Sequence, residues 1–110
     1  MNQVVVWNVK ININYKFDDI SDVLKEDIFK LIEKWFSQKL DRYLEKEVSP
    51  ENPEAHLQVS IKKNSKWLFD GNFNLKVWNT NVIYKREGFK NVFDLVNHFF
   101  DHAKEEFSKK

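Results

Sequence analysis

The sequence contains no cysteine, which excludes a disulfide framework and any metal site built on thiolates. It has only two glycines, Gly71 and Gly88, so a glycine-rich phosphate-binding loop is excluded as well. Residues 1–13 contain no basic region followed by a long apolar stretch, which argues against a signal peptide or a membrane span. We therefore expect a soluble protein, located in the cytoplasm, with no membrane partner.

Apolar material is plentiful in spite of these absences. The chain has 110 residues, of which 42% are hydrophobic, and it includes ten Phe and four Trp. This length is close to the commonest size of a single domain and supports one hydrophobic core. We find no internal repeat, low-complexity tract or linker, and expect one domain over residues 1–110.

Charge is nearly balanced in total but segregated along the chain. The formal net charge is +1, which argues against strong non-specific binding to nucleic acid. The net charge is +2 over residues 1–17, −5 over 18–55, +5 over 56–90 and −1 over 91–110. A partner would therefore meet a different charge on different elements of the fold.

Hydrophobic periodicity predicts a strand and then a long helix. Residues 7–14 alternate strictly between apolar and polar side chains, as in a strand with one buried face. Apolar residues then recur at spacings of three and four from Ile20 to Leu44. They predict an amphipathic helix of about 27 residues, on the order of 40 Å long. Asp18 and Ser21 are its two candidate N-caps.

The rest of the chain predicts three more strands and a second helix. The prolines lie within residues 48–55, which we expect to form a loop. Gly71 lies inside the third strand, where a bulge or a close backbone approach is expected. Asn91 is a suitable N-cap for the last helix. The three strands are expected at 56–62, 67–77 and 82–86, with turns at 64–65 and 78–81. The helix is expected to bury its apolar stripe, which consists of Val92, Leu95, Val96, Phe99, Phe100, Ala103 and Phe107.

Together these elements predict an α+β fold in the order β-α-β-β-β-α. Strands joined by short turns form an antiparallel meander, whereas a helical crossover usually joins parallel neighbours. Each strand has one apolar face, so both helices are expected to cover the same side of a four-stranded sheet. The other side is expected to remain open to water.

The open face of this sheet is the first candidate for function. Lys10, Lys62, Lys76 and Lys85 place one lysine on each strand, and amide and hydroxyl side chains accompany them. Such a surface suits contacts with the phosphates and sugars of RNA. The alternative interpretation is that these lysines only keep the protein soluble.

Other constellations are weaker. Trp78 and His56 are candidates for stacking on RNA bases, whereas Trp67, Phe69 and Phe73 are interpreted as core. His98 and His102 share one face of the last helix, but no further metal ligand is evident.

We find no nucleophile elbow and no acidic pair distinct from ordinary surface pairing. We therefore expect no enzymatic activity, no metal, no cofactor and no small-molecule substrate.

From Asn52 onward the sequence resembles a known family. The run NPEAHLQVSIKKN, the following WLFDGNFNLKVWNTNVIYKREGFKNVFDLVNHFFDHAKEEFSKK and the segment LIEKW at Leu31–Trp35 resemble the ribosome hibernation-promoting and ribosome-associated inhibitor family, also called sigma-54 modulation proteins. Members share the β-α-β-β-β-α order. Asn91–Val96 looks like the opening of the family's last helix, with Asn in place of the usual Asp. The chain resembles the short form, which lacks a C-terminal dimerisation domain.

The resemblance implies binding to ribosomal RNA of the small ribosomal subunit, in the channel of messenger and transfer RNA. Such a factor inhibits translation and protects idle ribosomes under stress, and we expect it to be a monomer off the ribosome. By position, the resemblance implies RNA contacts from Lys30, Lys34, Lys85, Arg86, Lys90 and Lys104. Lys62 and Lys76 join them as candidates from the open sheet face.

Two alternatives remain open at this stage. A double-stranded-RNA-binding domain has a similar α-β-β-β-α core and uses basic residues near the start of its last helix. The other alternative is a protein-interaction module that retains the fold without the RNA surface. It is favoured by the acidic first helix.

Overall fold

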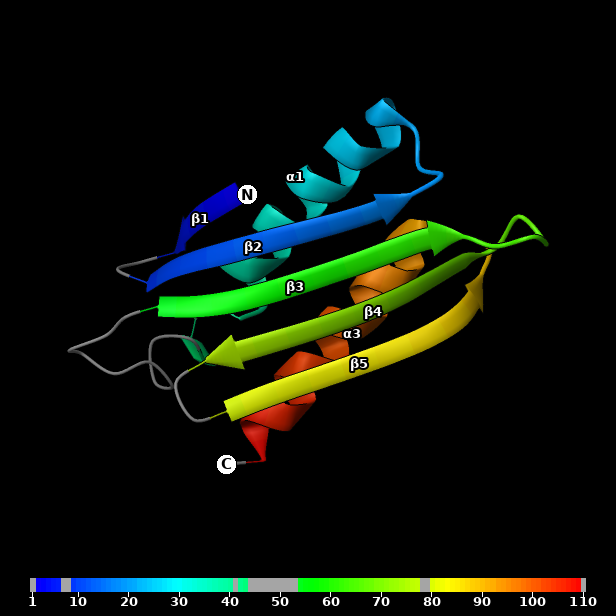
Figure 1. Cartoon of the computed structure of the whole chain (residues 1–110). Helices are drawn as coiled ribbons and strands as arrows, with labels where there is room; N and C mark the ends of the chain where they lie inside the picture. Colours follow the sequence, from blue (N-terminus) through cyan, green and yellow to red (C-terminus); the bar gives the residue numbers. More distant parts are fainter. Residues whose placement is uncertain (1, 7–8, 41, 44–53, 78–79, 110) are drawn as a thin grey trace.

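The computed structural model describes residues 2–6, 9–40, 42–43, 54–77 and 80–109. Figure 1 shows one sheet with two helices behind it. In chain order the elements are β1 (Asn2–Val6), β2 (Val9–Asp18), α1 (Asp22–Gln38), β3 (Glu54–Lys63), β4 (Phe69–Val77), β5 (Thr80–Phe89) and α3 (Val92–Ser108).

The sheet has the spatial order β1-β2-β3-β4-β5. β2 and β3 are parallel neighbours joined through α1, and β3, β4 and β5 form the antiparallel meander. The predicted α+β class and the β-α-β-β-β-α order are thus confirmed from β2 onward.

The structure adds β1, which pairs antiparallel with β2 at the edge of the sheet. Our sequence interpretation missed this strand, because Val4–Val6 is a short apolar run without alternation or a glycine or proline turn after it.

The first helix is shorter than predicted. Ser21 is its N-cap, and the hydroxyl accepts a hydrogen bond from the Leu24 amide at 3.2 Å. The helix ends at Gln38, where the Lys39 amide donates to the Trp35 carbonyl at 2.8 Å. Residues 39–40 form a turn and a bend, where Leu40 is completely buried, and residues 42–43 are helical again. The prediction of a continuous helix to Leu44 was therefore wrong at residues 39–40, and Leu44 itself lies outside the described residues.

The core lies between the sheet and the two helices. Phe36 of α1 meets Phe100 of α3 edge to face at 5.1 Å between ring centroids, and Phe73 of β4 stacks on Phe99 of α3 at 4.6 Å. Fully burying a side chain of this size stabilises a fold by about 1.5–3 kcal/mol. The seven predicted apolar residues of α3 are all buried, which confirms the predicted stripe.

Gly71 lies where β4 meets α3. The pairing of β4 with β5 shifts register between Phe69 and Gly71, and a Cβ atom on Gly71 would lie 2.6 Å from Leu95 Cδ2. Both predictions for this glycine, an irregularity and a close approach, are confirmed. α3 begins at the predicted N-cap, because Asn91 accepts a hydrogen bond from the Phe93 amide at 2.8 Å. Within the described ranges, no helix is long and apolar enough to cross a membrane.

Candidate nucleic-acid interface

The face of the sheet opposite the helices presents polar side chains in rows that cross the strands. The strand register aligns Lys16 of β2 with Ser60, Asn72 and finally Lys85 of β5. A second row runs through Asn12, His56, Lys76 and Asn81. All the lysines of these rows, and Lys10 and Lys62 beside them, are exposed. The predicted open face with its lysines is therefore present.

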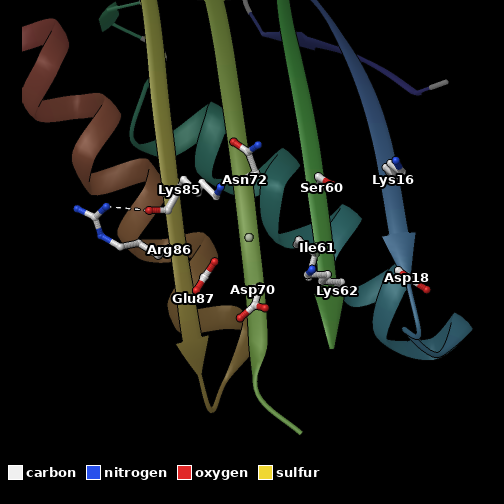
Figure 2. A pocket seen from close by; sticks show the side chains of 11 residues that line it. Lys16, Asp18, Ser60, Ile61, Lys62, Asp70, Asn72, Lys85, Arg86 and Glu87 are labelled. Carbon is white, nitrogen blue, oxygen red and sulfur yellow. Dashed lines mark hydrogen bonds between the residues drawn. The ribbon is translucent and has the colours of Figure 1, made fainter. Parts of the chain in front are cut away.

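One part of this face is hollowed into a shallow depression of about 400 Å³ (Figure 2). Lys16 and Lys85 lie on strands three spacings apart, or about 14 Å at the backbone. Ser60 and Asn72 lie between these two lysines. The complete lining is Lys16, Asp18, Ser60, Ile61, Lys62, Asp70, Gly71, Asn72, Lys85, Arg86 and Glu87.

Carboxylates occupy the other end of the depression. Asp18 lies opposite Lys62, and Lys62 in turn lies opposite Asp70. Asp70 has a structural role, because its Oδ1 accepts hydrogen bonds from Asn64 Nδ2 at 3.1 Å and from the Gly88 amide at 3.0 Å. The cationic end near Lys16 and Lys85 is therefore the part that fits an anionic partner.

The candidates named from the sequence do not form one surface. Lys62, Lys76 and Lys85 lie on the open sheet face, whereas the helical Lys30, Lys34 and Lys104 lie on the layer that covers the opposite face. All of these side chains are exposed, and so are Arg86 and Lys90.

Two of the predicted cations lie at the edge of the domain. Arg86 stacks over the Tyr84 ring at 4.7 Å, which places its guanidinium on the helix side of β5. Lys90 lies in the turn before α3. None of the eight predicted cations forms an ion pair with a carboxylate in the described ranges, so their charges are available to a partner.

The helical layer carries an excess of negative charge. α1 has three lysines against four acidic residues, and α3 has one lysine against four. Several cations on or beside the helices are already paired: Lys25 with Asp22 at 3.6 Å, Lys39 with Asp101 at 2.6 Å, and Lys109 with Glu105 and Glu106 at 3.6 and 3.8 Å. The open face is therefore the more favourable of the two faces for an anion.

The remaining candidates act structurally. The His98 ring packs on Phe89 at 5.4 Å between centroids, and the His102 ring packs on Tyr84 at 5.2 Å. No group of three or more His, Asp or Glu side chains in the described part of the chain could hold a metal ion.

Burial, with a smaller contribution from Glu33, raises the pKa of Tyr15, so this phenol stays neutral.

Of the two predicted stacking residues, His56 is exposed on the open face, while Trp78 lies outside the described residues.

The structure reveals two residues that our sequence interpretation missed. Lys16 continues the alternation of β2 beyond Asn14 and reaches the open face. Trp67 was interpreted as core, and that interpretation is wrong, because 73% of its surface is exposed in the turn between β3 and β4. The preceding Asn-Ser-Lys could have indicated a turn that removes Trp67 from the strand.

The chain is similar to known proteins at the level of the fold. No protein-family model and no curated protein sequence matches the chain. Among solved structures, the chain is similar to the N-terminal domain of Protein Y from Thermus thermophilus, with a TM-score of 0.61 and 14% identity. The match covers 89% of this chain and 97% of that domain. A ribosomal subunit interface protein from Coxiella burnetii matches with a TM-score of 0.49 and 19% identity, over 89% of this chain and 94% of that one. The chain therefore has the fold of the Protein Y domain, as its resemblance to the hibernation-promoting family implied.

Proposed function

We propose that this protein is a ribosome-binding factor that inhibits translation by occupying the channel of messenger and transfer RNA on the small ribosomal subunit. It acts as one domain and as a monomer, by binding ribosomal RNA and without a catalytic step or a cofactor. The observation that carries the proposal is a set of eight exposed cations, none of which forms an ion pair within the described ranges, on the fold of the Protein Y domain. That domain is of the hibernation-promoting-factor type which the sequence resembles.

The electrostatics of the two faces suit a partner that binds by phosphate contacts. A lysine that contacts a phosphate releases condensed counterions, so the affinity falls steeply with salt concentration. Lys16 and Lys85 offer such contacts across the open face, and the amide of Asn72 between them can donate hydrogen bonds to phosphate or ribose oxygens. A net charge of +1 is sufficient for such a partner because the acidic residues are concentrated on the helices.

Two triple variants test the proposal and determine which face is used. One variant reverses the open face (Lys62→Glu, Lys76→Glu and Lys85→Glu), and the other reverses the helices (Lys30→Glu, Lys34→Glu and Lys104→Glu). Both change the net charge by the same amount, so each is the matched control for the other. We expect the open-face variant to lose co-sedimentation with small subunits and the helix variant to lose less. The proposal is wrong if both triple variants sediment with ribosomes as the wild type does.

A double-stranded-RNA-binding domain is the second candidate, because α1, β3, β4, β5 and α3 follow the order of such domains. Lys90 is exposed directly before α3, but the only charged residue in the first turn of that helix is acidic, Asp94. A mobility-shift assay with a plain RNA duplex separates the candidates. Tight binding to the duplex, together with no preference for small subunits, would favour this second function.

A further inference from the structure

The turn between β3 and β4 holds one large aromatic side chain out in solvent. Trp67 is 73% exposed, although tryptophan is among the residues that gain most from burial. Two other large hydrophobic side chains of the described chain are similarly exposed, Val23 on α1 and Ile83 on β5. These three residues belong to different elements, and Trp67 is the only aromatic one among them in the described part of the chain.

The backbone at Trp67 adopts a conformation that favours glycine. Its φ is +64°, in the left-handed region, where a bulky residue is a clear outlier. The Trp67 amide donates to the Asn64 carbonyl at 3.0 Å, and the Asn64 amide donates to the Leu68 carbonyl at 2.8 Å. These bonds enclose a loop of three residues that ends in a left-handed residue, a hairpin in which glycine usually takes that last position. Strain of this kind persists only where the surrounding structure enforces it, and it is concentrated at functional sites.

The side chain of one asparagine stabilises the loop through hydrogen bonds. Asn64 Oδ1 accepts hydrogen bonds from the amides of Lys66 at 2.9 Å and Leu68 at 3.1 Å. The other end of the same side chain donates to Asp70, which also holds the Gly88 amide. The turn is therefore tied to Gly88 near the end of β5, and the backbone that carries Trp67 is held in a fixed position. A fixed position lowers the entropy cost of binding.

One lysine lies over the exposed ring, and two more are close to it in the sequence. Lys63 Nζ lies 5.2 Å from the centroid of the Trp67 ring and 5.6 Å from that of Phe69. Residues 60–69 contain three lysines and no acidic residue, and Lys62 and Lys66 are exposed. Lys62 also lines the depression, so the turn between β3 and β4 adjoins one end of the open face.

We propose that Trp67 stacks on an unpaired RNA base, while Lys63 and Lys66 contact the phosphates beside that base. The proposal rests on the proposed ribosome-binding function. It adds that the protein recognises a single-stranded segment of ribosomal RNA through this turn. Every base offers a flat face to one aromatic ring, and lysines beside the ring suit the backbone that carries the base. An apolar protein partner would need a wider patch around the tryptophan than this turn provides.

The substitution Trp67→Gly separates binding from structure. Glycine adopts the left-handed conformation without strain, so we expect the melting temperature to stay equal or to rise. Binding to a mixed-sequence single-stranded RNA dodecamer is expected to weaken about 5- to 100-fold, as measured by fluorescence anisotropy. Trp67→Phe retains a ring and is expected to lose less. Val23→Ala removes another strongly exposed hydrophobic side chain, on α1, and is expected to bind RNA as the wild type does.

An abasic strand of the same length provides the second arm of the test. It has phosphates but no bases, so wild type and Trp67→Gly are expected to bind it equally. The inference is overturned if the wild type binds ribosomes and the Trp67→Gly variant binds ribosomes and the dodecamer with unchanged affinity. It is also overturned if the substitution abolishes binding to anionic lipid vesicles and leaves RNA binding intact. Failure of the wild type to bind ribosomes at all would refute the proposed function, and this inference with it.

Discussion

Lys39 Nζ lies 2.6 Å from Asp101 Oδ1 and thereby joins the end of α1 to the middle of α3. The same ammonium group lies 4.3 Å from the centroid of the Trp35 ring. The Lys39 side chain is only 22% exposed, so this pair is less screened by water than the other ion pairs of the helical layer. The contact fixes the two helices against each other behind the sheet.

We expect Lys39→Ala to lower the free energy of unfolding by about 1–2 kcal/mol, because it removes both the ion pair and the contact with the ring. Asp101→Asn is expected to cost about half as much, because it removes the ion pair but leaves Lys39 in contact with the Trp35 ring. Urea unfolding followed by circular dichroism measures both variants. Lys25→Ala is the control, as its partner Asp22 is fully exposed, and a loss as large as that of Lys39→Ala would contradict this account.

Gly71→Ala is expected to destabilise the fold by about 1–3 kcal/mol, because the added methyl group would overlap with Leu95. The cause can be isolated in a double-mutant cycle with Leu95→Ala, which vacates the space. In that background the Gly71→Ala substitution should cost much less. Equal costs in the two backgrounds would show that the contact with Leu95 is not the reason for glycine at this position.

Ser21→Ala is expected to cost about 1 kcal/mol through loss of the cap on α1. Asp18 competed with Ser21 as the cap in the sequence, but it is the last residue of β2. Asp18→Ala should therefore leave the helix content unchanged. Comparison of the two variants by thermal unfolding checks this assignment, and it fails if Asp18→Ala is the more damaging change.

The partly buried phenol of Tyr15 predicts a loss of stability at alkaline pH. Burial raises its pKa in the folded state above the ordinary value of 10.0. The contribution of the neutral phenol to the free energy of unfolding is therefore complete below pH 10 and decreases as pH rises above that value. Urea unfolding between pH 8 and pH 11 should show a steeper decline for the wild type than for Tyr15→Phe. Parallel curves for the two proteins would contradict this role.

Period-two alternation was sufficient to predict β2, β3 and the exposed lysines, because each strand buries one face only. It failed at Trp67, which keeps the phase of Phe69 but lies in a turn set by hydrogen bonds to Asn64. Helical spacing likewise could not show that the helix ends at Gln38. Leu40 fits the apolar stripe and is buried, but after a bend in the backbone.

For a similar reason, the sequence could not show that the predicted cations of the helices and those of the open sheet face lie on opposite sides of the domain. Lys30 and Lys62 are both exposed, and only the packing of α1 on one side of the sheet puts them on opposite faces. The depression between Lys16 and Lys85 depends on the pairing of four strands in register, which no single strand encodes.

Sedimentation of the wild-type protein with purified ribosomal subunits tests the central claim most directly. We expect the protein to migrate with the small subunit at about 50 mM salt and to be released progressively by about 200 mM or more, as phosphate contacts require. A protein that remains at the top of the gradient at the lowest salt concentration would contradict the claim.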